Sequence, residues 1–85
     1  PRPPPTARKK LCYKDQRDYD LLPGRIEAIE AEMAGIEKDL SDGTLFIRDH
    51  AKFTALTGKL ETLRDEKAAA EDRWLELAEE VEGLQ

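Results

Sequence analysis

Six side chains near the N-terminus have the types and spacing that suit contact with a nucleic-acid backbone. Five are basic, and the ring of Tyr13 lies among them. Lysine and arginine neutralise phosphates, and an aromatic ring can stack on a base. The competing interpretation is a solvated tether whose charges balance the acidic stretch ELAEEVEGLQ, with Tyr13 packed on a second helix. We name the set the basic arm; it comprises Arg8, Lys9, Lys10, Tyr13, Lys14 and Arg17.

The charge of the chain changes sign along its length. Residues 1–17 carry six basic side chains and one acidic side chain, a net charge of +5. Residues 18–85 carry eight basic and eighteen acidic side chains, a net charge of −10. A basic arm on an acidic body predicts a contact confined to one end of the molecule. We expect that contact to be with phosphates, because no set of Asn, Gln or Arg suggests a groove-reading helix.

The other reactive side chains do not predict an enzyme. His50 has one neighbouring carboxylate, Asp49, which makes neither a metal site nor a catalytic dyad. Cys12 is the single cysteine, so it has no internal disulfide partner, and we expect it to be buried at the end of the helical core. The pair Gly58-Lys59 lacks the spacing of a phosphate-binding loop. We expect no catalytic residue, metal or cofactor in this chain, a cytoplasmic location and no membrane contact.

Two ladders of mostly apolar residues indicate the fold. One runs from Tyr19 to Leu40 and the other from Phe53 to Leu84, each in alternating steps of three and four residues. Charged residues make up 39% of the chain and aromatic residues 6%, too little apolar material for a thick core. We predict an all-α fold, an intramolecular antiparallel two-stranded coiled-coil hairpin. We expect a monomer, with a loose four-helix dimer as the alternative.

The expected organisation is a linker followed by one domain. Residues 1–10, PRPPPTARKK, predict a disordered Pro-rich basic linker. We interpret it as a tether to an upstream domain, and the alternative is a ligand for a proline-binding module. Residues 11–85 predict the hairpin domain, with arm one at about 13–40, a connector at 41–49 and arm two at about 50–84. Pro23 has no amide proton, so we expect the first arm to be kinked or broken there.

The connector contains its own capping and packing signals. Gly43 is suited to a left-handed cap after the first helix, and Asp49 can cap the second. The three apolar residues Leu45, Phe46 and Ile47, which we name the tip, predict either a plug over the end of the core or a partner-binding surface.

Matching the two ladders gives a register. It places Tyr19 opposite Trp74 and Leu40 opposite Phe53. The one charged residue on the second ladder is Lys67. Its ammonium group is costly to bury unpaired, so we expect it to reach Glu27 or Glu30 at the edge of the core.

Several short strings in order carry a family resemblance. They are KKLCYKDQRDYDLLPGRIEAIEAEM, the break DLSDG, the linker FIRD and the late string EDRWLEL. Together they resemble the C-terminal coiled-coil domain of Uup-type ABC-F proteins, which are tandem ATP-binding-cassette ATPases without a membrane domain. The resemblance covers Lys10 to about Leu77. One departure is Cys12, where the family usually has a serine that would cap the helix better.

The resemblance implies a domain joined by a linker to an ATPase that uses ATP and Mg²⁺. It also implies nucleic-acid binding, in proteins linked to DNA transactions and ribosome function. We therefore expect a nucleic-acid-binding module that uses the basic arm, with DNA favoured and RNA as the other candidate. The alternative is a structural arm that positions the ATPase on a partner such as the ribosome through the tip.

Overall fold

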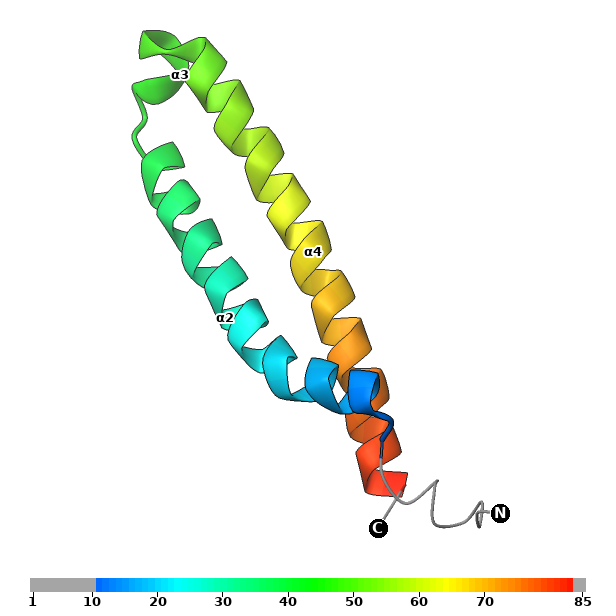
Figure 1. The fold of residues 1–85 in the computed structure, drawn as a ribbon. Coiled ribbons are helices and arrows are strands. Elements are labelled where there is room, and N and C mark those ends of the chain that lie inside the picture. Colours follow the sequence, from blue (N-terminus) through cyan, green and yellow to red (C-terminus); the bar gives the residue numbers. More distant parts are fainter. Residues whose placement is uncertain (1–10, 84–85) are drawn as a thin grey trace, which may run out of the picture.

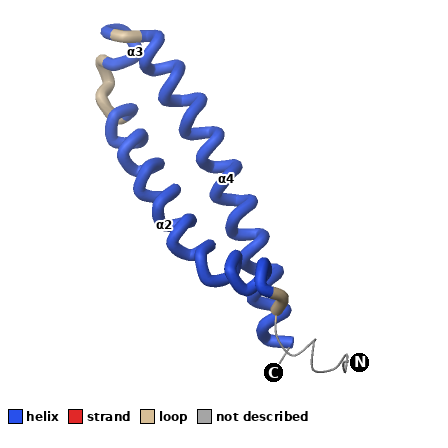
Figure 2. The backbone as a smooth tube through the Cα atoms, in the orientation of Figure 1, coloured by secondary structure: helices blue, strands red, loops and turns tan. Residues whose placement is uncertain are grey.

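The computed structural model describes residues 11–83, and these residues form helices joined by short turns. The helices are α2 (Tyr13–Leu40), α3 (Leu45–Arg48) and α4 (His50–Gly83) (Figures 1 and 2). The described residues contain no strand, so the predicted all-α class is confirmed. None of the three helices has an apolar stretch long enough to cross a membrane. The predicted linker at 1–10 and the end of arm two at Leu84 lie outside the described residues.

Helices α2 and α4 lie side by side and run in opposite directions, forming a rod of 67 × 18 × 14 Å (Figure 1). Their shared core consists of Ile29, Ile36, Leu60 and Leu63, each at most 7% exposed. All four lie on the apolar ladders of the sequence. Every third or fourth residue of a helix falls on one face, so the ladders meet along a narrow line of contact. The buried residues of the described part are all hydrophobic, and burial of this line is the main source of stability.

Pro23 lies inside α2 and does not break it. The helix is continuous from Tyr13 to Leu40, so the expected alternative of two separate pieces is wrong. Proline cannot donate a hydrogen bond to the carbonyl group of the residue four positions earlier, which here is Tyr19. In Figure 1 the blue first turns of α2 lean across α4, away from the direction of the rest of the helix. These turns contact α4 through ion pairs of Asp15 and Asp18 and through the ring of Tyr19.

The turn after α2 is stabilised by Asp42 instead of by a left-handed glycine. The expected left-handed cap at Gly43 is wrong, because no described glycine has a positive φ. The Asp42 carboxylate accepts hydrogen bonds from the Thr44 N–H at 2.9 Å, the Thr44 hydroxyl at 2.8 Å and Arg48 Nη2 at 2.6 Å. The bonds from Thr44 and then from Arg48 lower the pKa of Asp42 to about 2. Side-chain hydrogen bonds of this kind let aspartate form a turn without special backbone angles.

The second helix is capped as expected. Asp49 directly precedes α4, and its Oδ1 atom accepts a hydrogen bond from the Lys52 N–H at 3.0 Å. This bond satisfies one of the free amides in the first turn of α4, so the predicted role of Asp49 as the cap is confirmed.

The three tip residues have different environments. Leu45 is 2% exposed and closes the end of the core, as the plug interpretation predicts. The Phe46 ring packs edge-on against Phe53 and His50, with ring centroids 5.1 and 4.7 Å apart, yet Phe46 remains 52% exposed. Ile47 is 85% exposed. The plug interpretation therefore accounts for Leu45 and part of Phe46, and it leaves Ile47 unexplained.

Lys67 lies on the apolar face of α4, with its side chain 29% exposed. Its Nζ atom lies 3.1 Å from Glu30 and 3.9 Å from Glu71, which confirms the expected contact with Glu30. The hydrogen bond to Glu30 raises the pKa of Lys67. We predict that Lys67→Leu raises the melting temperature by about 4 °C, because leucine buries more apolar surface and partly exposed ion pairs contribute little.

Thermal unfolding followed by far-UV circular dichroism would measure this effect. Lys59→Leu is the matched control, since Lys59 pairs with Glu32 at 3.0 Å but is 57% exposed. We expect no increase for the control. A lower melting temperature for Lys67→Leu would show that the ion pair stabilises the register more than apolar packing does.

Candidate nucleic-acid interface

The first two turns of α2 present the described part of the basic arm to solvent. Tyr13 is 82% exposed, and Lys14 and Arg17 are exposed. Neither Lys14 nor Arg17 forms an ion pair with another residue of the range 11–83. The spacing of three and four residues places Arg17 beside both Lys14 and Tyr13 on the helix surface. The other arm residues, Arg8, Lys9 and Lys10, lie outside the described range.

The start of α2 lacks a side-chain cap. Cys12 stands at the capping position with extended backbone angles, and its side chain makes no capping hydrogen bond. Cys12 is also exposed, so the expectation that it is buried at the end of the core is wrong. It precedes the first helical turn, which places it before the apolar ladder and not on it. The first amide groups of α2 therefore receive no acceptor from this residue, and such groups attract anions.

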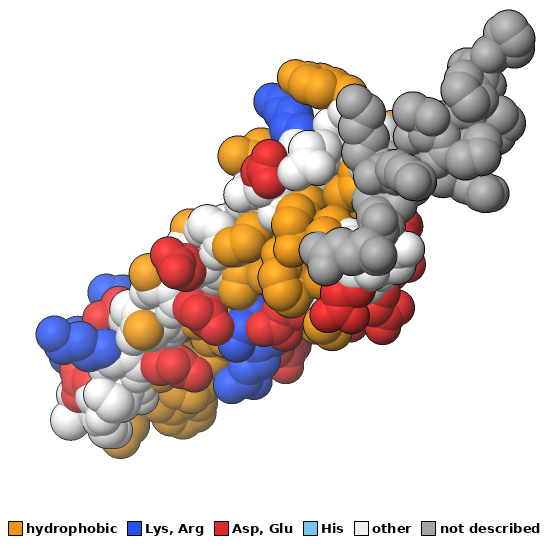
Figure 3. Space-filling view, turned by 90° about the horizontal axis from the view of Figure 1, so that it is seen from below, with side chains coloured by type: hydrophobic (Ala, Val, Ile, Leu, Met, Phe, Trp, Pro, Cys, Tyr) orange, Lys and Arg blue, Asp and Glu red, His pale blue; other side chains and the backbone are white. Residues whose placement is uncertain are grey.

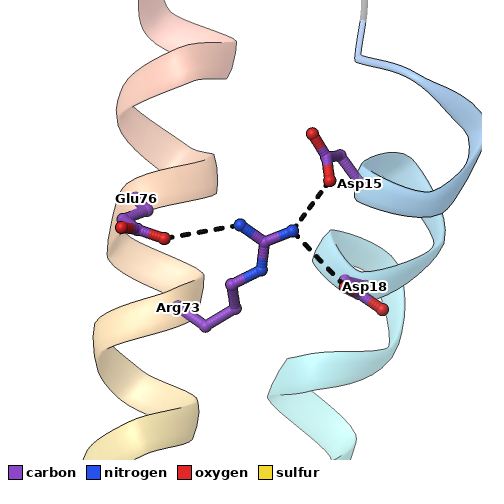
Figure 4. Close-up of polar contacts among 4 residues, drawn as sticks. All are labelled: Asp15, Asp18, Arg73 and Glu76. Carbon is purple, nitrogen blue, oxygen red and sulfur yellow. Dashed lines mark hydrogen bonds and ion pairs between the residues drawn. The ribbon is translucent and has the colours of Figure 1, made fainter.

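Two acidic side chains of the same turns, Asp15 and Asp18, face the other way, toward Arg73 of α4 (Figure 4). Arg73 Nη2 lies 2.7 Å from Asp15 Oδ1 and 3.5 Å from Asp18 Oδ2. Its Nη1 atom lies 3.4 Å from Glu76 Oε1 on its own helix. The hydrogen bond to Asp15 is the main cause that raises the pKa of Arg73. Arg73 thus neutralises carboxylates that would otherwise repel a phosphate.

An aromatic pair fixes the same segment next to Arg73. The rings of Tyr19 and Trp74 are stacked, with centroids 5.8 Å apart and planes 9° from parallel. The contact predicted from the two ladders is therefore confirmed. These rings pack against each other, which makes them part of the contact between α2 and α4 and leaves Tyr13 as the exposed aromatic residue of the arm.

One face of α2 contains arm neighbours that the sequence reasoning missed. Gln16, Asp20 and Leu21 line a shallow, open hollow together with Tyr13 and Arg17. Gln16 Nε2 donates a hydrogen bond to Asp20 Oδ1 at 3.0 Å, and Leu21 is 58% exposed. Their spacing of three and four residues from Tyr13 and Arg17 could have identified them. The Asp20 carboxylate opposes phosphate binding at this hollow, whereas Gln16 offers a polar contact.

In the view of Figure 3, the side chains of the described residues form no broad basic surface. Seen from below, Lys and Arg side chains form small separate groups among acidic ones. Acidic side chains also gather beside the apolar surface at the end where α2 begins. A polyanion would therefore meet repulsion along the body of the rod, which favours the basic arm as its point of contact.

Comparison with known proteins identifies the family. Residues 10–79 match the family described as the ABC transporter C-terminal domain. The chain is 33% identical over 82 residues to the uncharacterized ABC transporter ATP-binding protein YfmR of Bacillus subtilis, and 35% identical over 80 residues to the ATP-binding protein Uup of Haemophilus influenzae. These matches cover 96% and 87% of the chain. A search of solved structures found no match.

The same comparisons show how much of the relatives this chain represents. The aligned regions amount to 13% of YfmR and 12% of the Haemophilus Uup protein. The Uup protein of Escherichia coli is 28% identical over 65 residues, which are 76% of the chain and 10% of that relative. The family match and the resemblance of the motifs agree along nearly the whole described rod. The chain belongs to the ABC transporter C-terminal domain family and is the C-terminal domain of a Uup-type ABC-F protein.

Proposed function

We propose that this domain binds nucleic acid through the basic arm, without reading its sequence, and that DNA is the preferred partner. The observation that carries the proposal is the separation of charges on the first turns of α2. Lys14 and Arg17 are exposed on the helix surface, while Asp15 and Asp18 face Arg73. This arrangement leaves two basic side chains and one carboxylate, Asp20, on the outer surface, so that surface keeps a net positive charge although the two kinds of residue alternate in the sequence.

The helix start adds to this attraction. The N-terminus of a helix has a partial positive charge, and its first amide groups are donors for phosphate oxygens. Cys12 supplies no acceptor to those amides, and Lys14 lies within the first turn. A phosphate near the start of α2 would therefore meet backbone donors and a lysine together, while Tyr13 could stack on an unpaired base.

Salt dependence tests the proposal. If the arm neutralises about four phosphates, the logarithm of affinity falls against the logarithm of salt concentration with a slope of about −3.6 for duplex DNA and about −2.8 for single strands. Fluorescence anisotropy with labelled duplexes of unrelated sequence would measure this slope, and RNA of the same sequence would test the preference for DNA. We expect similar affinities among the duplexes. A slope close to zero, or no binding at low salt, would contradict the proposal.

A second candidate function is supported by the tip. Ile47 is 85% exposed and Phe46 is 52% exposed, at the far end of the rod from the start of α2. Exposed apolar residues at the end of a helical rod can contact a protein partner. In this alternative the domain is an arm that positions its ATPase on a partner such as the ribosome. An exchange of Ile47 for Ser would then reduce partner binding and leave DNA binding unchanged.

A further inference from the structure

We propose that Arg73 is a positioning residue for Tyr13, Lys14 and Arg17 of the basic arm, acting by docking residues 13–22 of α2 onto α4. We name residues 13–22 the leading segment. This inference rests on the proposed function, because the role assigned to Arg73 is to orient the residues that are proposed to bind nucleic acid. Docking by Arg73 also accounts for the position of the first turns of α2, which precede a proline that cannot donate the usual helical hydrogen bond.

Two kinds of contact hold the leading segment on α4. Arg73 reaches Asp15 at 2.7 Å and Asp18 at 3.5 Å, one helical turn apart, and its side chain is 35% exposed. The adjacent residue, Trp74, stacks on Tyr19. The string RW in EDRWLEL therefore contacts the string DQRDY near the start of the chain. Two of the strings that carry the family resemblance meet across the rod.

One hydrogen bond is missing from α2 next to the leading segment, and this gives the docking a structural role. Pro23 follows the leading segment and has no N–H group, so the usual helical hydrogen bond to the Tyr19 carbonyl group cannot form. The helix is weakened at the point where the leading segment joins the rest of α2. Tyr19 itself stacks on Trp74, which places a contact with α4 at the site of the missing bond. Without Arg73, the turns before Tyr19 would lose their ion pairs with α4 and would rely more on local helix propensity, which is weak for so short a segment.

Docking also determines which charges face outward. With Asp15 and Asp18 turned to Arg73, the exposed surface of the same turns carries Lys14 and Arg17 against the single carboxylate of Asp20. Undocking would release both carboxylates into solvent beside these basic side chains. It would also allow the first turn of α2 to unwind and would disperse the helix-start amides. Arg73 thus supports phosphate contact from the opposite side of the helix.

The experiment uses the 85-residue chain and two readouts. Emission of Trp74, the single tryptophan, reports the Tyr19 stack, and anisotropy of a labelled duplex reports binding. We expect Arg73→Ala to shift the emission to the red and to weaken duplex binding about fivefold. Arg64→Ala is the control, because it removes the same charge from an exposed position of α4. It should leave the emission unchanged and weaken binding by less than about twofold.

A charge exchange completes the test. The double variant Asp15→Arg with Arg73→Asp keeps the net charge and rebuilds one ion pair across the rod. We expect it to recover only part of the emission, because Asp18 and Glu76 lie beside position 73, and the emission is its readout because the new arginine itself attracts phosphate. Unchanged emission in Arg73→Ala would overturn the docking role. If Arg73→Ala shifts the emission to the red but weakens duplex binding no more than Arg64→Ala does, the positioning role is overturned. If the unmodified chain binds no duplex, the proposed function fails, and with it the positioning role, while the emission still reports docking separately.

Discussion

Leu63→Ala should lower the melting temperature of this domain by about 10 to 20 °C. Leu63 is 5% exposed and packs with Ile29, Ile36 and Leu60 at the middle of the rod. Replacing a buried leucine with alanine costs about 2–5 kcal/mol, and we expect the lower part of that range because a thin rod can partly close the cavity. Domains of this size are stable by only about 5–10 kcal/mol, so the loss is a large share of the total.

Leu75→Ala is the matched control for this prediction. It makes the same chemical change on the same helix, but Leu75 is 54% exposed. We expect its melting temperature to change by no more than about 3 °C. Thermal unfolding of both variants by circular dichroism decides the question. Equal losses would mean that the contact between α2 and α4 does not supply the stability of the rod.

The apolar ladders were sufficient to predict the contacts at the centre of the structure. Helical periodicity places residues three and four positions apart on one face, and two such faces can pair in few registers. For this reason the Tyr19–Trp74 stack and the Lys67–Glu30 ion pair could be predicted from the sequence. The Asp49 cap was also predictable, because aspartate before a helix has a local and well-defined role.

Three expectations drawn from local rules failed, each for a different physical reason. Proline favours a break in a helix, but α2 is continuous through Pro23, and its turns before the proline contact α4 through Asp15 and Tyr19. Gly43 can adopt a left-handed conformation, but the hydrogen bonds of Asp42 form the turn without it. Cys12 was expected in the core because it is apolar, but it stands before the helix and outside its apolar face.

The candidate interface was predictable in composition and not in geometry. The cluster of basic residues is visible in the sequence, and so are the carboxylates among them. Which carboxylates are neutralised depends on Arg73, which lies 58 residues from Asp15 in the chain. Many acidic residues surround Arg73 in the sequence, so spacing alone could not select its partners. The separation of charges that supports the proposed function therefore emerged only from the structure.

Replacing Lys9, Lys10, Lys14 and Arg17 together with alanine should abolish duplex binding and leave the helix content nearly unchanged. Lys14 and Arg17 are exposed and lie off the apolar ladder, so their loss removes phosphate contacts without removing core packing. With about four fewer neutralised phosphates, the salt-dependent part of the affinity disappears. Anisotropy with a labelled duplex at low salt measures binding, and circular dichroism measures helix content.

A second quadruple variant separates the basic arm from the effect of net charge. Arg25, Lys38, Lys52 and Arg64 are exposed on the body of the rod, and none forms an ion pair within residues 11–83. Changing these four to alanine removes the same charge but leaves the arm intact. We expect this variant to bind with a modest loss and an unchanged salt slope, because long-range charge effects are screened over about 10 Å at 0.1 M salt.

If both variants lose binding equally, net charge explains the interaction. If the arm variant binds as well as the unmodified chain, the basic arm is not the interface, and the exposed Phe46 and Ile47 of the tip become the leading candidate for partner contact.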